Sequence, residues 1–326
     1  MYAQVSRNLS SAVNGWTSFS SPATVSRKTR RLSAVVLLYA FGCVAMSLFL
    51  LSYLGEWLPL ADALAVFRLH LAIMAGTVAL LLPAKGKTAF GAILALAAVG
   101  SAIPQLATAT LPRSVGHSEY SLYQKNLLFS NATPGMVRSD IARTAPDFVT
   151  LQELSERNLN ALESLLVEYP GSIICRGNGP RGVAVLTRHK LSEVETRCYP
   201  DLNLALARVD LGHKKIWVAS VHLRWPFPYK QWSQAKGIEE VISKLDGEIV
   251  VGGDFNMVRS GYSVARIERA AGSRVVGRIS VTFPRFSPLV PLAIDHVLVP
   301  STSGAEVEKR PLLGSDHHGL LARFRI

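Results

Sequence analysis

Apolar residues crowd into one part of this 326-residue chain, between about residues 32 and 111, and become sparser afterwards. Three apolar runs lie in that part, and each has room for a helix that crosses a bilayer, which takes about 20 residues. This distribution is not that of an ordinary soluble protein, and it predicts a membrane part followed by a globular part. The runs cover residues 32–54, 63–82 and 88–108, and Arg68 in the second is expected to reach the interface.

Positive charges around these runs predict their orientation. A basic cluster at residues 27–31 precedes the first run, and Lys85 and Lys87 follow the second. Because loops rich in Lys and Arg stay in the cytoplasm, we expect three crossings and a globular part outside the cytoplasm. In a bacterium this describes a multi-pass protein of the inner membrane that faces the periplasm. A second run lying in the interface would instead leave the globular part inside, and a cleavable signal peptide is the alternative for the first run.

The predicted organisation has four parts. Residues 1–31 form a basic cytoplasmic tail, 32–111 a transmembrane region of about three helices, 112–121 a linker, and 122–326 a globular domain. In that domain strand-like runs alternate with helical stretches, which predicts two packed sheets flanked by helices. The strand-like runs are 122–129, 148–151, 182–187, 204–210, 216–222, 249–252, 294–299 and 320–326, and the helical ones are 136–145, 158–169 and 231–244.

Polar residues follow several of these runs, where active-site groups commonly collect. Asp254 and Asn256 come after two glycines and point the same way if the backbone is extended. One could accept a proton from water and the other could donate to a phosphoryl oxygen, although the same residues also form ordinary turns. Glu153 ends a buried run, which suits a ligand of a hard cation or an acid at the start of a helix.

Histidine and carboxylate groups recur at the ends of other runs. A single histidine is usually structural, but this repetition is hard to explain by packing, because buried charge is costly without a partner or a metal. The residues are His222, Asp295, His296, Asp316, His317 and His318.

Six short motifs appear in a fixed order over about 200 residues, at 125–128, 146–153, 220–223, 253–256, 294–297 and 315–317. Together they closely resemble the signature of the endonuclease/exonuclease/phosphatase superfamily, and the apolar runs are similar to those of its membrane-anchored bacterial members. The resemblance implies a four-layer α/β sandwich of two packed mixed sheets flanked by helices, here preceded by a transmembrane helical region, with the site at one end of the sheets.

The resemblance also implies a metal-dependent phosphoric ester hydrolase that uses Mg²⁺, with Mn²⁺ as a substitute. Glu153 would be the main metal ligand, assisted by Asn126 and Asp316. Oxygen ligands of this kind are those that Mg²⁺ prefers. Asp254 would orient or deprotonate the attacking water.

The remaining implied roles concern the phosphate. Asn256 would hold the phosphoryl group, and His317 would bond it while Asp295 orients the imidazole. His222 would act near the leaving group. The resemblance implies no essential role for His296 and His318, which we interpret as structural.

The substrate is the least determined feature. The net charge of +12 suits an anionic partner, nucleic acid or phospholipid, but part of it sets the membrane topology. A nuclease-like phosphodiesterase, a lipid or inositol/sugar phosphatase and an inactive binding module all stay open, with the bilayer as a further partner and no obligate protein partner evident. The basic segment 257–294 could bind a polyanion or be a solvated face. The aromatic residues within 225–229 could stack on a base, enter the bilayer or pack in the loop.

The three cysteines do not have the spacing of a zinc site. Cys43 lies in the first apolar run and is interpreted as a small apolar residue. Cys175 and Cys198 could pair if the globular part faces an oxidising compartment. Two separate buried thiols are the preferred interpretation.

Overall fold

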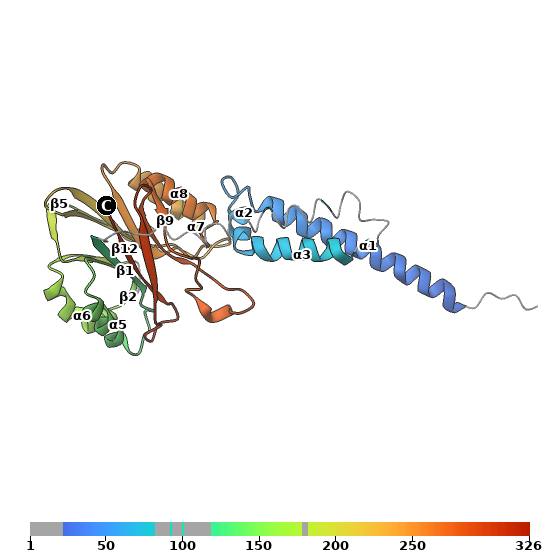
Figure 1. The fold of residues 1–326 in the computed structure, drawn as a ribbon, viewed down its shortest axis with the longest axis horizontal. Helices are drawn as coiled ribbons and strands as arrows, with labels where there is room; N and C mark the ends of the chain where they lie inside the picture. The colour runs from blue at the N-terminus through green and yellow to red at the C-terminus, as the bar shows by residue number, and fades with distance from the viewer. Residues whose placement is uncertain (1–21, 82–91, 93–99, 101–118, 178–181) are drawn as a thin grey trace, which may run out of the picture.

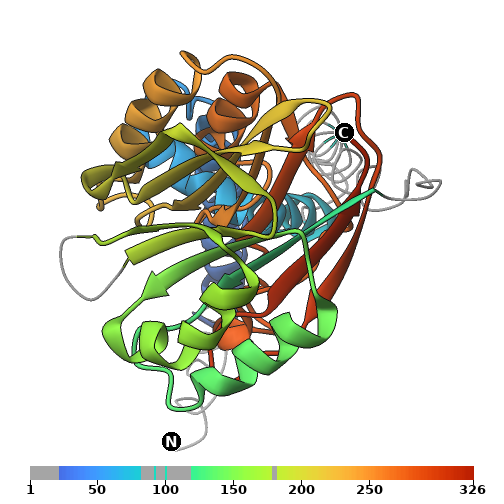
Figure 2. The same cartoon turned by 90° about the vertical axis from the view of Figure 1, so that its left-hand side faces the viewer.

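The computed structural model describes residues 22–81, 92, 100, 119–177 and 182–326. Two mixed β-sheets pack face to face, and helices cover the outer face of each, so that the layers run helix, sheet, sheet, helix (Figure 2). This confirms the four-layer α/β sandwich expected from the sequence. A pair of long helices protrudes from one side of the sandwich (Figure 1).

Six strands and two helices form the half of the sandwich around the first sheet. They are β1 (Tyr120–Asn126), α5 (Pro134–Thr144), β2 (Phe148–Leu154), α6 (Glu156–Glu168), β3 (Gly171–Cys175), β4 (Gly182–Thr187), β11 (Ala305–Arg310) and β12 (Gly319–Phe324). The strand order is β11-β12-β1-β2-β4-β3, and the central pair β1 and β2 is parallel. Helices α5 and α6 bury Ile141 and Leu165 in an apolar cluster with this sheet.

The second half has the same number of strands and helices. They are β5 (Lys190–Tyr199), β6 (Leu204–Asp210), β7 (Lys215–His222), α7 (Gln231–Ile242), β8 (Ile249–Asp254), α8 (Tyr262–Ala271), β9 (Ser273–Val275) and β10 (Asp295–Pro300), with short 3-10 helices η3 (Pro200–Leu202) and η4 (Pro284–Phe286). The strand order is β5-β6-β7-β8-β10-β9, and the central pair β7 and β8 is parallel. Helices α7 and α8 bury Ile238 and Ile267 in a cluster with the second sheet.

Two glycines at the end of β8 allow a close approach between chains. A Cβ atom on Gly252 would lie 2.2 Å from the side-chain oxygen of Thr150 in the first sheet. A Cβ atom on Gly253 would lie 2.2 Å from the carbonyl oxygen of Val221 on the neighbouring strand. Because any side chain here would force the strands apart, these glycines bring the next residue, Asp254, close to both sheets.

The basic segment 257–294 contains helix α8 and strand β9, neither of which was predicted. Arg266 pairs with Glu239, and Arg269 donates to the hydroxyl of Tyr262 at 2.6 Å. Arg259 donates to backbone carbonyls 2.9 and 3.1 Å away. Arg259, Arg266 and Arg269 therefore make contacts within the fold, whereas Arg278 and Arg285 are exposed.

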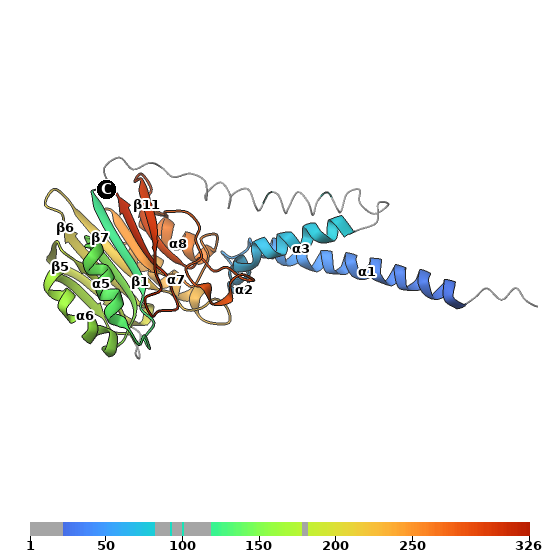
Figure 3. The same cartoon turned by 60° about the horizontal axis from the view of Figure 1, so that its bottom comes forward.

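The protruding pair consists of α1 (Pro22–Leu51) and α3 (Arg68–Leu81), which pack along each other (Figure 3). Between them, α2 (Pro59–Leu64) and the 3-10 helix η1 (Ala65–Phe67) dock onto the sandwich. Asp62 accepts hydrogen bonds from the backbone N–H groups of Tyr262 at 2.5 Å and Ser263 at 3.0 Å, in the first turn of α8. The base of the helical pair is thus part of the packing of the second half.

One run within the described residues, Pro59–Val78, is long and apolar enough to cross a membrane, and Val35–Leu51 is a shorter apolar helix. A single run of this kind also occurs in buried core helices and signal sequences, so multi-pass anchoring remains an expectation. The expected third run, 88–108, lies outside the described residues except for residues 92 and 100. Arg68 lies where the helical pair meets the sandwich and donates to the backbone oxygens of Ser52 and Ser260 at 2.5 and 2.6 Å, so its expected place at the membrane interface stays a prediction.

Cys175 and Cys198 form a disulfide, so the preferred interpretation of two separate thiols was wrong. Cys175 ends β3 at the edge of the first sheet, and Cys198 lies in β5 at the edge of the second. The sequence could not show this, because the two residues become neighbours only when the edges of the sheets are superposed. The disulfide joins the two halves of the sandwich along one side.

Candidate active site

The site begins with three neighbouring residues at the end of the second sheet. Asp254 is the last residue of β8, and it lies beside His222 of β7 and Asp295 of β10 in the strand register. All three side chains are at most 6% exposed. The sequence placed each residue at a strand end but could not show that the three strands are adjacent.

The first sheet contributes amides that join this group to the opposite layer. Asn126, the last residue of β1, donates to Asp254 Oδ2 at 2.9 Å. Gln124, two residues earlier, donates to Asp295 Oδ1 and to the side chain of Gln152, each at 2.9 Å. Because these bonds are buried, they hold the two carboxylates in fixed positions between the sheets.

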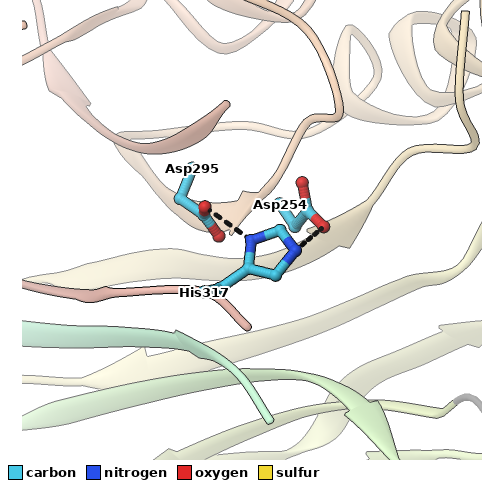
Figure 4. Close-up of side chains that lie close together, drawn as sticks. All are labelled: Asp254, Asp295 and His317. Atoms are coloured by element: carbon cyan, nitrogen blue, oxygen red, sulfur yellow. Dashed lines mark hydrogen bonds and ion pairs between the residues drawn. The ribbon is translucent and has the colours of Figure 1, made fainter. Parts of the chain in front are cut away.

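His317 lies between the two carboxylates, on the loop before β12 (Figure 4). Its Nδ1 is 2.8 Å from Asp295 Oδ2, and its Nε2 is 3.7 Å from Asp254 Oδ2. Burial opposes charge on the ring, yet the carboxylates of Asp295 and Asp254 raise the pKa of His317 to about 10. At neutral pH His317 is therefore an imidazolium, which donates from Nδ1 to Asp295 and forms an ion pair through Nε2 with Asp254.

The pKa values of the two buried carboxylates are shifted in opposite directions. Burial disfavours ionisation of both, but the adjacent imidazolium holds the pKa of Asp295 below its usual value. At Asp254 burial dominates and raises the pKa to about 7, since His317 is farther away. Asp254 is thus the weaker acid of the pair, with a pKa suited to accepting a proton near neutrality.

Glu153 lies at an irregular point of β2, where the pairing with β4 shifts register. Its φ of 55° is in the left-handed region, which a glutamate rarely occupies without support. Its Oε2 accepts from the backbone N–H of Phe129 at 3.1 Å, and its Oε1 lies 3.9 Å from His222 Nε2. The bulge turns this carboxylate out of the strand and toward the group around Asp254.

Asn256 also has a positive φ, of 46°, and its backbone N–H donates to Asp254 Oδ1 at 2.9 Å. Its side-chain nitrogen donates to the carbonyl oxygen of Leu223 at 2.8 Å and to Asp254 Oδ2 at 3.4 Å. The side-chain oxygen of Asn256 is buried and has no hydrogen-bond partner among the described residues. The long bond to Asp254 is the one that could be exchanged for a bond to a ligand.

His222 and Asp316 complete the set of predicted residues. His222 Nε2 is 3.6 Å from Asp254 Oδ2, which places the ring between Asp254 and Glu153. Asp316 is half-buried and close enough to His317 to help raise its pKa. Asp316 has no hydrogen bond or ion pair with another residue in the described part of the chain, in contrast to the other predicted site residues.

Within the described residues, one group of three side chains could hold a metal ion by distance, because the ligand atoms of Asp254, Asp295 and His317 lie within 4.8 Å of one another. The hydrogen bonds weaken this candidate, since His317 uses Nδ1 as a donor to Asp295 and is protonated at neutral pH. A protonated imidazole cannot ligate a metal. The Glu153 carboxylate, whose side chain is 15% exposed, is more available to a cation.

Several residues that support the site were not identified from the sequence. Lys125 is fully buried, and its ammonium donates to the carbonyl oxygens of Pro311, Leu312 and His317 at 2.5 to 3.2 Å. It fixes the loop that carries His317. Phe283 stacks on the His317 ring, with 4.7 Å between the centroids.

His296 and His318 lie outside this group. His296 bonds the carbonyl oxygen of Met257 at 2.8 Å, and burial lowers its pKa to about 4, so it is neutral. His318 bonds the carbonyl oxygen of Arg310 at 2.9 Å. Both contacts are with the backbone, as expected for structural histidines.

Comparison of the sequence with profiles of known protein families gives one match. A profile described as the Endonuclease/Exonuclease/phosphatase family matches residues 124–317, from Gln124 to the imidazolium. The chain belongs to this family. Comparison with curated proteins found no significant match.

Solved structures share the fold at low sequence identity. A humanized D. rerio TDP2 with 14 mutations is 20% identical, with 64% of this chain and 99% of that chain covered and a TM-score of 0.52. D. rerio TDP2 complexed with single strand DNA product gives the same identity and coverage and a TM-score of 0.51. An endonuclease/exonuclease/phosphatase from Bacteroides vulgatus is 18% identical, with coverage of 63% and 98% and a TM-score of 0.51. At these identities the similarity concerns the fold alone.

Proposed function

We propose that this protein is a membrane-anchored, Mg²⁺-dependent phosphodiesterase. The observation that carries the proposal is the buried chain Asp295–His317–Asp254, which lies beside Glu153 at the end of a sandwich of the matched family. Hydrolysis of a phosphodiester needs a base for water and positive groups for the phosphoryl oxygens. This group supplies both, at distances fixed by buried hydrogen bonds.

The side chains fit a hard cation beside Glu153. Glu153 Oε1 and Asp254 Oδ2 both lie within 4 Å of His222 Nε2, so two carboxylates are near each other there, and carboxylate oxygens are ligands that a hard cation prefers. Glu153 would hold the ion, with Asn126 and Asp316 as further oxygen donors. When bound, Mg²⁺ would polarise the phosphoryl group and lower the charge on its oxygens. Asn126 already donates to Asp254, so it also connects the proposed metal ligand to the proposed base.

In the proposed mechanism Asp254 holds and deprotonates the attacking water. Its pKa near 7 leaves it ionised in part at neutral pH, and the bonds from Asn126 and the backbone of Asn256 fix its orientation. Proton acceptance by a positioned group of this kind contributes about 10²–10⁴-fold to the rate. Asp254 is therefore the residue from which we expect most of the proton chemistry.

The positive charge on His317 would then stabilise the phosphoryl oxygens. Asp295 keeps the ring protonated and in one orientation through its 2.8 Å bond. Asn256 would add a neutral donor by releasing its 3.4 Å bond to Asp254, and His222 would serve the leaving group. Asp254 would thus be a base with a pKa near neutrality, and His317 would be a donor that stays protonated up to about pH 10.

These pKa values predict a bell-shaped pH profile. Activity requires ionised Asp254, so it should rise with pH through a limb no higher than about pH 7, because a bound cation lowers this pKa further. Activity also requires protonated His317, so it should fall through about pH 10. Initial rates on bis-p-nitrophenyl phosphate between pH 5 and 11 measure both limbs. A profile whose alkaline limb lies near the ordinary histidine pKa would show that Asp295 does not act on His317 as described.

The choice between substrates requires direct assay. Plasmid DNA, phospholipid vesicles and bis-p-nitrophenyl phosphate, each with Mg²⁺, separate a nuclease-like enzyme from a lipid phosphoesterase or phosphatase. A lipid substrate is the second candidate, because the helical pair carries exposed apolar side chains such as Phe41 (50%) and Ile73 (57%). Absence of Mg²⁺-dependent hydrolysis across the panel would favour an inactive binding module and contradict the proposal.

We also propose that the sandwich lies outside the cytoplasm. The basic residues at 27–31 are at the end of α1 remote from the sandwich, and Lys and Arg favour the cytoplasmic side. The Cys175–Cys198 disulfide independently supports an oxidising compartment. Alkaline phosphatase fused to the C-terminus should be active, and a fluorescent protein at the same position should be dark. The reverse pair of results would place the sandwich in the cytoplasm.

A further inference from the structure

A cavity of about 410 Å³ lies where the helical pair meets the sandwich, and Asp295 is the one residue of the proposed catalytic group that lines it. Its volume is within the range of about 300–1,000 Å³ that is usual for small-molecule sites. The walls come from η1 and α3, from the loop after β8, and from the loop between β9 and η4. Its apolar lining includes Val66, Leu69, Val276, Val281 and Leu320.

The charged side chains that line this cavity are positive, except for one buried carboxylate. Arg259 and Arg278 line it, whereas its one carboxylate is Asp295, already bound to His317. Arg259 donates to the carbonyl oxygens of Val276 and Gly277 but makes no ion pair with a carboxylate in the described part of the chain. Its Nε is buried without a hydrogen-bond partner among the described residues. Backbone carbonyl oxygens do not neutralise the charge of this guanidinium, and an anion in the cavity would.

The position of the cavity indicates where such an anion would come from. One wall is the first turn of α3, whose outer face exposes Leu69 (40%) and continues to Ile73 (57%). If lipid covers this face, as the proposed membrane location requires, acyl chains lie directly beside the apolar wall. A lipid headgroup would then be at the level of Arg259 and Arg278.

We propose that this cavity binds one acyl chain of an anionic phospholipid from the surrounding bilayer, with Arg259 and Arg278 pairing with its phosphate. The inference rests on the proposed membrane location but not on the proposed hydrolysis. The bound lipid would be a resident ligand that fixes the sandwich against the membrane, since its binding site includes both the helical pair and the catalytic domain. Thr282 and Asp295 also line the cavity, so its occupant contacts the layer behind His317.

Photocrosslinking tests this site on the full chain. The protein is placed in phosphatidylcholine nanodiscs that contain a trace of phosphatidylglycerol with a photoreactive acyl chain, and adducts are mapped by peptide mass spectrometry. We expect adducts within 65–70, 258–260 and 276–282. A matched probe with a phosphatidylcholine headgroup keeps the phosphate but has no net charge, because its choline cation offsets it. It should label these peptides about five-fold less, as for the loss of the attraction between one basic residue and a net negative headgroup.

Two variants make the test decisive. Ser280→Trp fills the cavity and should abolish labelling of these peptides, with Ser280→Ala as the control that should keep it. Arg278→Glu should remove the preference for the anionic probe, and Arg285→Glu, an exposed arginine of the same loop region that does not line the cavity, should leave it unchanged. Melting temperatures show whether each variant folds. If Ser280→Trp does not fold, Ala293→Trp replaces it as the variant that fills the cavity.

Adducts confined to the outer faces of α1 and α3, or equal labelling by both probes, would overturn the proposal. Hydrolysis is measured separately on a soluble phosphodiester. A chain that fails to hydrolyse that substrate but is labelled as expected would refute the proposed function and leave the lipid site standing.

Discussion

An Asp254→Asn variant is expected to hydrolyse phosphodiesters about 10³-fold more slowly than the wild type while keeping its fold. Asparagine has the size of aspartate, but it cannot accept a proton from water. It would also remove one of the three carboxylates that raise the pKa of His317. The substitution should therefore lower the rate and move the alkaline limb of the remaining activity to lower pH.

The matched control is Asp246→Asn. Asp246 is a surface carboxylate whose side chain is 76% exposed and pairs with Arg208 at 2.9 Å. Solvent screens an exposed ion pair of this kind, so the control should retain both activity and the pH profile. Stopped assays at saturating substrate, together with circular dichroism, separate lost chemistry from lost folding. Wild-type turnover by folded Asp254→Asn would remove Asp254 from the mechanism.

The strands that could be predicted are those whose own residues form a continuous apolar run. The strands at 182–187 and 204–210 were predicted with their observed bounds, because their apolar runs are buried in the structure. The edge strand β11 was missed because Glu306, Glu308 and Lys309 interrupt its pattern, although it pairs with β12 along its length. Its main-chain hydrogen bonds, which the sequence does not reveal, hold it in place.

The residues of the site also fall into two groups, those that the sequence could identify and those that it could not. Residues such as Glu153, Asp254 and His317 could be selected because polar groups after buried runs are costly without a function. Lys125 could not, since its ammonium is satisfied by carbonyl oxygens about 190 residues away, and any residue type can supply a carbonyl. For the same reason the sequence could not show that Asp62, near the second apolar run, bonds the start of α8.

A Glu153→Gln variant tests which residues hold the metal, and it should lose about 10³-fold in Mg²⁺-dependent activity. Glutamine keeps the length of the side chain and can still accept from the backbone of Phe129. It removes the charge that a hard cation requires. Calorimetric titration with Mg²⁺ should therefore show weakened binding, and added Mg²⁺ should not restore the wild-type rate.

The same titration separates the two possible metal sites. If Glu153 holds the ion, Asp295→Asn should retain Mg²⁺ binding and lose activity through a lowered pKa of His317, because Asp295 is the first of the carboxylates that raise it. If the ion instead lies between Asp254, Asp295 and His317, Asp295→Asn should lose binding and Glu153→Gln should keep it. Glu156→Gln is the control for the glutamate substitution, since Glu156 is exposed and pairs only with Arg176 among the described residues. The protonated state of His317 favours the first outcome, because an ion bound at that ring would have to displace its proton.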